Sequence, residues 1–242
     1  MNLLIIGTAR SGTTSLLTTL AGEVYHKVNE PFLVYPQHVI QRINNSKLTN
    51  KIEARPKEYP LTELDEYESV CVKTIVDQIP DVFKKSECDI ENTKLFLNEF
   101  SQNFDKIILL DRLNLDEHWF SMLNLLYKMW GNPKDVKGEW NKHSPFAIWY
   151  KEDIPTNWDK KMKDGGFYDG FIKSKQLLNK ISEHFDLPIF YYENLYSKNK
   201  EHQTTSLEKL CSYLGDKSLL KQLIDGLNPN KKLLQFNKKN LI

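Results

Sequence analysis

The chain has 242 residues, and its 33 basic and 32 acidic side chains give a formal net charge of +1 at pH 7. This balance excludes a general electrostatic attraction to nucleic acid or to an anionic membrane, so any anion site must be local. The three cysteines, Cys71, Cys88 and Cys211, match no zinc or redox spacing, and we expect reduced thiols and no metal site. No apolar run approaches the ~20 residues of a membrane span, and we expect a cytoplasmic protein with one domain over residues 1–242.

The chain opens with an apolar run and a glycine-containing turn, in the sequence MNLLIIGTARSGTTSLLTTL. Leu3 to Ile6 predicts a short buried strand, and apolar spacing from Thr13 onward predicts a helix. The backbone amides and the positive dipole end at the start of a helix attract anions. The stretch therefore predicts a strand, a phosphate loop and a helix. Further donors in the loop are one guanidinium and three hydroxyl groups, those of Arg10, Ser11, Thr13 and Thr14.

This loop departs from the Walker pattern, G-x-x-x-x-G-K-[ST], at the position of its phosphate-binding Lys. Gly7 and Gly12 have the Walker spacing, and Thr14 occupies the Ser/Thr position. Thr13, however, stands where the Lys is required, and a cation is found instead at Arg10. An ATPase would lack its main cation here, which favours a different phosphate-bearing ligand.

The run R-S-G-T-T, from Arg10 to Thr14, resembles the 5′-phosphosulfate loop of sulfotransferases that use 3′-phosphoadenosine 5′-phosphosulfate, whose core is [KR]-[SA]-G-T-T. The resemblance implies a three-layer α/β fold, with a mostly parallel β-sheet flanked by helices and a P-loop-like nucleotide site. It also implies which loop residues bind the cofactor, namely Arg10, Ser11, Gly12, Thr13, Thr14 and Ser15. The alternative for this stretch alone is a structural glycine turn between a strand and a helix.

Two further strands, Glu23 to Val28 and Ser69 to Lys73, are predicted next along the chain. Pro31 pushes Glu30 into an extended conformation at a strand's carboxyl end, where open α/β sheets bind ligands. In the resembled family an acidic residue here is the proposed general base, and a Lys after the next strand lies close to the transferred group. The resemblance thus implies catalytic roles for Glu30 and Lys73, together with Arg10. The alternatives are a solvated Glu and a Lys that extends to solvent.

A second polar motif, D-R-L-N-L-D-E-H-W-F-S, follows the apolar strand run Lys106 to Leu110. Asp111 is placed like a Walker B carboxylate, which is the strongest single point for a Mg-ATP-dependent kinase. The motif is also similar to the R-x-N-L pattern, with a Ser nine places after the Arg, of bacterial-type carbohydrate sulfotransferases. The residues that reproduce it are Arg112, Asn114, Leu115 and Ser121.

A helix is expected to place these residues around one phosphate. Asn114 can cap the helix with Glu117 at the third position, and Ser121 lies two turns from Asn114 on the same face. The resemblance implies that Arg112 and Ser121 bind the 3′-phosphate, and we expect capping to turn the Glu117 carboxylate aside. The alternatives are an ordinary helix serine and a surface ion pair of Arg112 with a neighbouring Asp.

The remaining chain holds fewer signals. Residues 44–68 form a long polar connection of no predictable fold, and residues 131–166 mix aromatic and polar side chains in a way that suits a small-molecule or glycan acceptor. A lid that packs on the sheet is the alternative for the second segment. Tyr168 to Phe185 predicts an amphipathic helix and Leu187 to Tyr192 a strand. The run Y-E-N-L at that strand's end resembles the family's Y-E-D-L, and we expect its Glu193 to be architectural.

Together the motifs predict a sulfotransferase. It would transfer a sulfuryl group from 3′-phosphoadenosine 5′-phosphosulfate to an acceptor hydroxyl on a carbohydrate or glycolipid, release adenosine 3′,5′-bisphosphate, and need no metal. Two alternatives stay open at this point. One is a Mg-ATP-dependent P-loop kinase of a nucleotide or small molecule, and the other is a catalytically silent nucleotide-binding protein.

Overall fold

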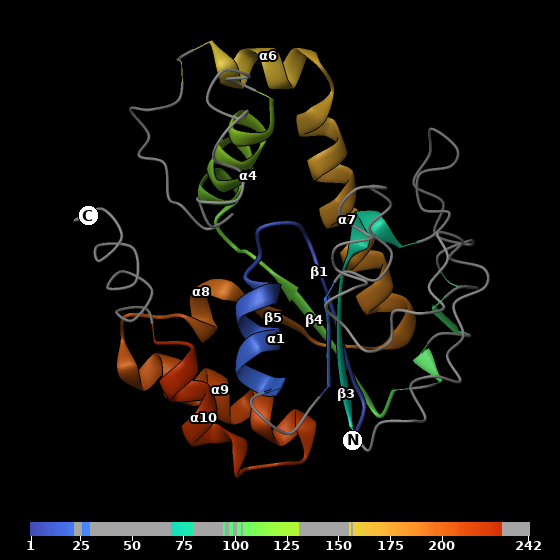
Figure 1. The fold of residues 1–242 in the computed structure, drawn as a ribbon, viewed down its shortest axis with the longest axis vertical. Coiled ribbons are helices and arrows are strands. Elements are labelled where there is room, and N and C mark those ends of the chain that lie inside the picture. Colours follow the sequence, from blue (N-terminus) through green and yellow to red (C-terminus); the bar gives the residue numbers. More distant parts are fainter. Residues whose placement is uncertain are drawn as a thin grey trace.

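The structure is a computed structural model, and it describes residues 1–21, 26–29, 69–79, 104–130 and 157–228, with a few single positions between these ranges. Within them, five strands form one parallel sheet in the order β2-β3-β1-β4-β5 (Figure 1). The strands are β1 (Leu3–Gly7), β2 (His26–Asn29), β3 (Val70–Ile75), β4 (Lys106–Asp111) and β5 (Ile189–Tyr191). The prediction of an α/β fold with a parallel sheet is confirmed.

β1 is the centre of the sheet. Its Ile5 is in register with Lys73 of β3 on one side and with Ile108 of β4 on the other. Because the strands are parallel, their carboxyl ends meet at one edge of the sheet. The chain continues from β1 to β2 and β3 on one side of it and then crosses to β4 on the other side. A ligand in an open α/β sheet binds at such a point.

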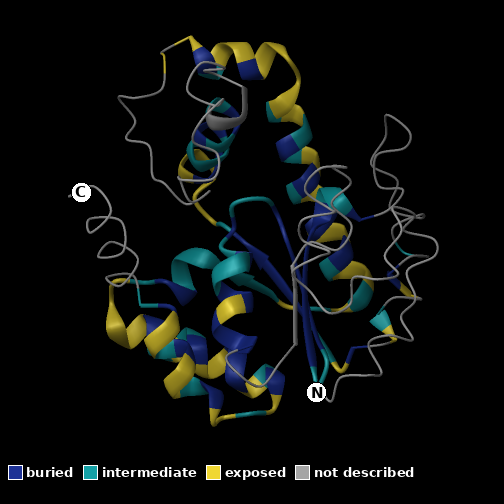
Figure 2. Ribbon diagram, in the orientation of Figure 1, coloured by how far each residue is buried: buried dark blue, intermediate teal, exposed yellow. Residues whose placement is uncertain are grey.

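Alternate residues of β1 point to opposite faces, and each face is covered by helices (Figures 1 and 2). Leu3 and Ile5 pack into one apolar cluster and Leu4 and Ile6 into another, so the strand is apolar throughout its length. The first face is covered by α1 (Thr13–Ala21), α8 (Tyr192–Leu195), α9 (Lys200–Leu214) and α10 (Leu219–Gly226), and the second by α7 (Phe167–Phe185).

A third apolar cluster lies beyond the carboxyl ends of the strands, where α4 (Leu115–Trp130) and α6 (Trp158–Asp164) meet the start of α7 (Figure 1). Trp119 packs there with Trp158 and Phe171, and its Nε1–H donates to Asp159 Oδ1 at 2.7 Å. Helix α6 falls inside the segment 131–166, for which the sequence pattern predicted no helix. Residues 131–154 lie outside the described residues. We call α4, α6 and the start of α7 the upper arm.

Several boundaries differ slightly from the expected ones. Helix α7 begins at Phe167, one residue early, and ends at Phe185 as predicted. The strand expected from Leu187 to Tyr192 is shorter, because β5 spans Ile189–Tyr191 and Tyr192 already begins α8. Within the described ranges, no helix has the length and apolar content needed to cross a membrane.

Candidate functional site

The β1–α1 loop (Thr8–Gly12) lies at the carboxyl edge of the sheet. Thr8 O accepts two hydrogen bonds from Ser11, one from its N–H at 3.2 Å and one from its Oγ–H at 2.7 Å. Arg10 has a φ of 68°, in the left-handed region that a non-glycine residue rarely adopts, and Gly12 follows with a φ of 89°. A strained residue of this kind often belongs to a ligand site. The loop therefore has a defined shape.

Gly12 is required by its neighbours as well as by its φ. A Cβ at this position would lie 2.7 Å from Cδ2 of Tyr192. Tyr192 stacks on Tyr196 with ring centroids 4.4 Å apart, and the Tyr196 hydroxyl donates to Gly12 O at 3.2 Å. Tyr192 and Tyr196 thus pack against the loop at Gly12 and help to hold its position.

The start of α1 presents unused donors. Within the described ranges, the backbone N–H groups of Arg10, Gly12, Thr13 and Thr14 donate to no protein acceptor. Amides in a turn that includes a left-handed residue, followed by a helix start, form an anion-binding concavity. Lys73 adds a charge here: its side chain is 1% exposed, and its Nζ donates to Thr14 Oγ1 at 3.3 Å.

Arg10 links the loop to the second motif. Its Nε–H donates to Ser121 Oγ on α4 at 3.2 Å, although the two residues are 111 positions apart in the chain. Burial lowers the pKa of Arg10, and the nearby charge of Arg112 lowers it further. The sequence placed Ser121 with Arg112 around one phosphate; the structure gives Ser121 a hydrogen bond with Arg10 and brings Arg112 close enough to repel that guanidinium.

Arg112 is held by two carboxylates. Its Nε–H donates to Glu193 Oε1 at 3.3 Å, its Nη2 lies 3.2 Å from Glu117 Oε2, and its guanidinium sits 4.6 Å from the Tyr192 ring centroid. The Glu193 carboxylate also accepts the N–H of Leu113 at 2.8 Å. Burial alone would raise the pKa of Glu193, but this amide and Arg112 bring it below its usual value. The alternative of an ion pair for Arg112 is thus formed, but with Glu117 and Glu193 in place of the neighbouring Asp that was expected.

The cap of α4 is formed as predicted, except for one carboxylate. Asn114 Oδ1 accepts the N–H of Glu117 at 3.1 Å, which is the expected cap. In a capping box the Glu117 carboxylate would accept the Asn114 N–H in return. Glu193 Oε1 accepts that N–H instead, at 3.4 Å, and Glu117 turns to Arg112. Glu193 thus supports both Arg112 and the helix start.

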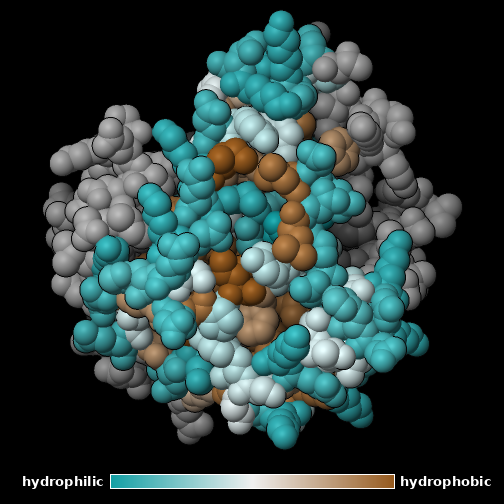
Figure 3. Space-filling view, turned by 180° about the vertical axis from the view of Figure 1, so that it is seen from behind, coloured by the Kyte–Doolittle hydropathy of each residue, from teal (hydrophilic) through white to brown (hydrophobic). Residues whose placement is uncertain are grey.

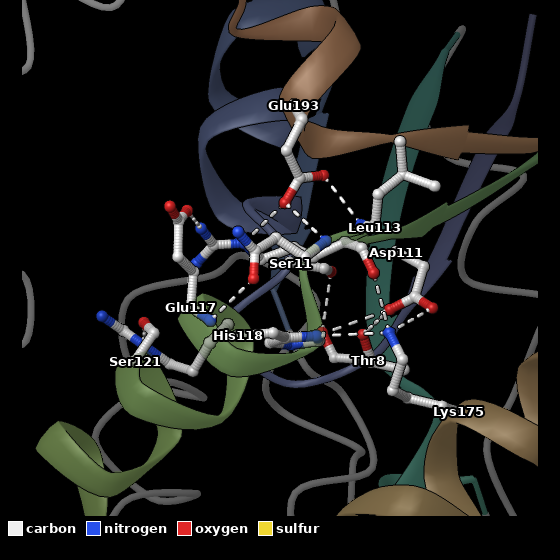
Figure 4. Close-up of polar contacts among 12 residues, drawn as sticks. Thr8, Ser11, Asp111, Leu113, Glu117, His118, Ser121, Lys175 and Glu193 are labelled. Carbon is white, nitrogen blue, oxygen red and sulfur yellow. Dashed lines mark hydrogen bonds and ion pairs between the residues drawn. The ribbon is translucent and has the colours of Figure 1, made fainter.

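A second group of polar side chains lies behind the loop, and we call it the buried network: Thr8, Asp111, His118 and Lys175 (Figure 4). Asp111 Oδ1 accepts the Thr8 hydroxyl at 2.6 Å, and Asp111 Oδ2 lies 2.6 Å from Lys175 Nζ. His118 is fully buried, and its Nε2 is 2.6 Å from Ala9 O. Burial lowers the pKa of His118 to about 4, with Lys175 acting in the same direction.

Sequence reasoning missed three members of the buried network, Thr8, His118 and Lys175. Asp111 was found, but as a candidate metal ligand. The structure shows both of its oxygens engaged by the hydroxyl of Thr8 and the ammonium of Lys175. A Lys in the middle of an amphipathic helix gives no sequence signal of a buried partner.

Glu30 lies outside the described residues. The described part of β2 ends at Asn29, which is in register with Lys73 of β3. The predicted general base therefore remains a prediction from the sequence. No family model, curated protein or solved structure matches the chain, so the site is interpreted from its own chemistry.

Proposed function

We propose that the chain is a sulfotransferase that uses 3′-phosphoadenosine 5′-phosphosulfate and transfers its sulfuryl group to an acceptor hydroxyl. The observation that carries the proposal is the hydrogen bond from Arg10 to Ser121. It joins two motifs, each weak alone, that the resemblance assigns to the two ends of one cofactor. The position of the β1–α1 loop on the central strand of a parallel sheet supports a P-loop-like nucleotide site.

The donors present suit a ligand with more than one anionic group. Loop amides, Arg10 and the Lys73–Thr14 pair would hold the 5′-phosphosulfate, and Arg112 with Ser121 would hold the 3′-phosphate. The cofactor supplies an activated sulfuryl group on a phosphate leaving group. Burial and the nearby charge of Arg112 lower the pKa of Arg10, so the charged form of Arg10 gains from an anion placed beside it.

The roles of the residues follow from where charge develops. Arg10 and Lys73 are proposed to stabilise the negative charge on the leaving phosphate, a preorganised effect that is stronger away from water. Glu30, from its place after β2, is proposed to take the proton of the acceptor hydroxyl, a role worth ~10²- to 10⁴-fold in rate. The acceptor would enter beside the upper arm, where Figure 3 shows a hollow bordered by both hydrophobic and hydrophilic residues.

The environment of Asp111 favours this proposal over a kinase. A kinase needs a carboxylate available to Mg²⁺, whereas Asp111 is 4% exposed and accepts from Thr8 and Lys175. A Lys ammonium already neutralises the carboxylate. A metal ligand role would require both contacts to be given up.

Calorimetry separates the candidates. We expect adenosine 3′,5′-bisphosphate to bind without a divalent metal, and ATP with Mg²⁺ to bind much more weakly. Transfer is then measured with ³⁵S-labelled cofactor and a panel of sugar, glycolipid and phenolic hydroxyl acceptors. Tight binding of Mg-ATP without a response to the bisphosphate would favour the kinase. Bisphosphate binding with no transfer to any acceptor would favour a silent nucleotide-binding protein.

A further inference from the structure

His118 lies behind the β1–α1 loop rather than in it, yet it contacts the residue that precedes Arg10. Its Nε2 is 2.6 Å from Ala9 O. We propose that His118 is a positioning residue, which fixes the Ala9 carbonyl and thereby aims the Arg10 guanidinium at the anion site. The identity of the anion rests on the proposed function, whereas the positioning of Arg10 does not.

The proton positions on the His118 ring follow from its partners. A carbonyl oxygen only accepts, so Nε2 carries a proton and donates to Ala9 O. Nδ1 lies 3.4 Å from Lys175 Nζ, which only donates, so Nδ1 is the unprotonated nitrogen. Phe171 packs edge-on against the ring at a centroid distance of 4.8 Å. One tautomer and one orientation of His118 are therefore selected.

Lys175 has three ammonium protons and three acceptors for them. Its Nζ is 2.6 Å from Asp111 Oδ2, 2.8 Å from Arg112 O and 3.4 Å from His118 Nδ1. A protonated Nδ1 would face this ammonium at 3.4 Å and repel it. Asp111 Oδ1, 3.7 Å from Nδ1, already accepts the Thr8 hydroxyl, and the carboxylate is paired with Lys175. The buried network thus keeps His118 neutral, in the form that donates to the loop.

The effect on Arg10 follows from the geometry of a peptide bond. In a planar trans peptide the C=O and the next N–H point in opposite directions. Holding Ala9 O toward His118 therefore turns the Arg10 N–H away from His118, and this N–H has no acceptor within the described ranges. The same constraint helps to keep Arg10 at its left-handed φ of 68°. Thr8 O, held by Ser11, fixes the preceding peptide plane.

Helix α4 forms hydrogen bonds with two successive residues of the loop, Ala9 and Arg10. His118 and Ser121 are three positions apart and lie on the same face of the helix. His118 donates to Ala9 O, and Ser121 accepts from Arg10 Nε. Figure 4 shows both side chains extending from α4. The two contacts thus tie α4 to both Ala9 and Arg10.

NMR tests the proposal without any ligand. In ¹⁵N-labelled protein, long-range couplings are expected to show His118 as the Nε2–H tautomer, and the Arg10 Nε–H signal is assigned by its loss in Arg10→Lys. We expect His118→Leu to increase exchange of that Nε–H about tenfold, the effect of one lost hydrogen bond, and His118→Gln, which keeps an N–H donor, to restore protection. An Nδ1–H tautomer, or an unchanged Arg10 signal in His118→Leu, would overturn the proposal.

Binding gives the second test. We expect His118→Leu to weaken adenosine 3′,5′-bisphosphate about tenfold in the wild-type background and to have almost no further effect in Arg10→Ala, because coupled residues are not additive. Asn124→Leu is the matched control: it removes a buried polar group of α4 whose amide donates to Phe120 O within the same helix. Equal effects in both backgrounds would overturn positioning through Arg10. If the wild type binds no bisphosphate, the proposed function fails, and the NMR result still decides the role of His118.

Discussion

The two halves of the β1–α1 loop differ in their electrostatic environment: the first half is neutral and the second is positive. Thr8 and Ala9 contact the buried network, where one ammonium, one carboxylate and one neutral imidazole sum to no net charge. Arg10 and the residues after it belong to an edge where the described side chains are three cations, Arg10, Lys73 and Arg112, against two carboxylates. One of these carboxylates, Glu117, is 64% exposed. The balanced half is suited to shape the loop, and the positive half is suited to bind an anion.

Because of this difference, the residues of the loop that contribute to stability are distinct from those that would bind a ligand, although the loop has only five residues. A buried charge without a partner is costly, so the network must be complete in the folded protein. An anion site, in contrast, works because its donors are not fully used before the ligand arrives. Changes in the first half are therefore expected to alter mainly the free energy of unfolding, and ligand affinity only through Arg10. Changes in the second half are expected to alter ligand affinity directly.

The largest effect is expected from Asp111→Ala. The change leaves the Lys175 ammonium, 16% exposed, without its carboxylate. Loss of one partner of a buried ion pair typically costs about 3–5 kcal/mol. We expect a decrease of that order in the free energy of unfolding, measured by urea denaturation. The double variant Asp111→Ala with Lys175→Met should recover much of the loss. A decrease below about 1 kcal/mol would mean that the network is not structural.

Arg10→Gly tests the other half of the loop. Glycine adopts the left-handed φ without strain, which offsets its greater freedom in the unfolded chain and the lost hydrogen bond. We expect the free energy of unfolding to stay within about 1 kcal/mol of the wild type. Affinity for adenosine 3′,5′-bisphosphate should fall by about 1.5–3 kcal/mol, the value of a hydrogen bond to a charged group. Arg10→Lys, which keeps the charge, should lose less. Unchanged affinity in Arg10→Gly would remove Arg10 from the site.

Acid pH is expected to weaken the buried half selectively. The pKa of His118 is about 4 in the folded protein, against 6.5 in an unfolded chain. Between these values the unfolded chain binds more protons, so stability is complete above pH 6.5 and decreases as the pH falls toward 4. At pH 5 the protonation of His118 in the unfolded chain lowers the free energy of unfolding by about 2 kcal/mol relative to its value well above pH 6.5. The charged groups around the ring are Asp111, Lys175 and Arg112.

The measurement compares the wild type with His118→Gln, which has no titrating ring. The free energy of unfolding is obtained by urea denaturation at pH 7 and at pH 5. The wild type should lose about 2 kcal/mol more than His118→Gln over this interval. Equal losses would mean that His118 titrates normally in the folded protein.

Much of the fold could be predicted because it depends on local patterns. The apolar runs predicted the buried strands β1, β3 and β4 of the parallel sheet, and the spacing of Gly7 and Gly12 predicted a turn between β1 and α1. The pairing of Arg10 with Ser121 could not be predicted, because it depends on the left-handed φ of Arg10. The ion pair of Lys175 also could not be predicted, because its partner Asp111 lies 64 residues away in the chain. Glu193 was identified as architectural from the Y-E-N-L run, but its contacts with Arg112 and the start of α4 are long-range and needed the structure.

The smallest effect is expected from Glu117→Gln. The direction of its change in bisphosphate affinity shows whether Glu117 has the same role as Glu193. Glu117 is exposed, and such a surface ion pair contributes only ~0–1 kcal/mol to stability. We therefore expect the free energy of unfolding of Glu117→Gln to match that of the wild type. Two charges 4 Å apart interact by about 1 kcal/mol in water. Removal of this carboxylate should therefore tighten the bisphosphate by about two- to fivefold at low salt, with the gain lost at 1 M salt.

Glu193→Gln is the matched comparison, because Glu193 also accepts the amides of Leu113 and Asn114. Its loss should lower the free energy of unfolding by about 1–3 kcal/mol, the cost of an incompletely satisfied charged hydrogen-bond site. Calorimetry at two salt concentrations and urea denaturation measure both effects. If Glu117→Gln weakens the bisphosphate instead, Arg112 needs Glu117 to hold its position. The edge would then be preorganised by both carboxylates, as the loop is by the buried network.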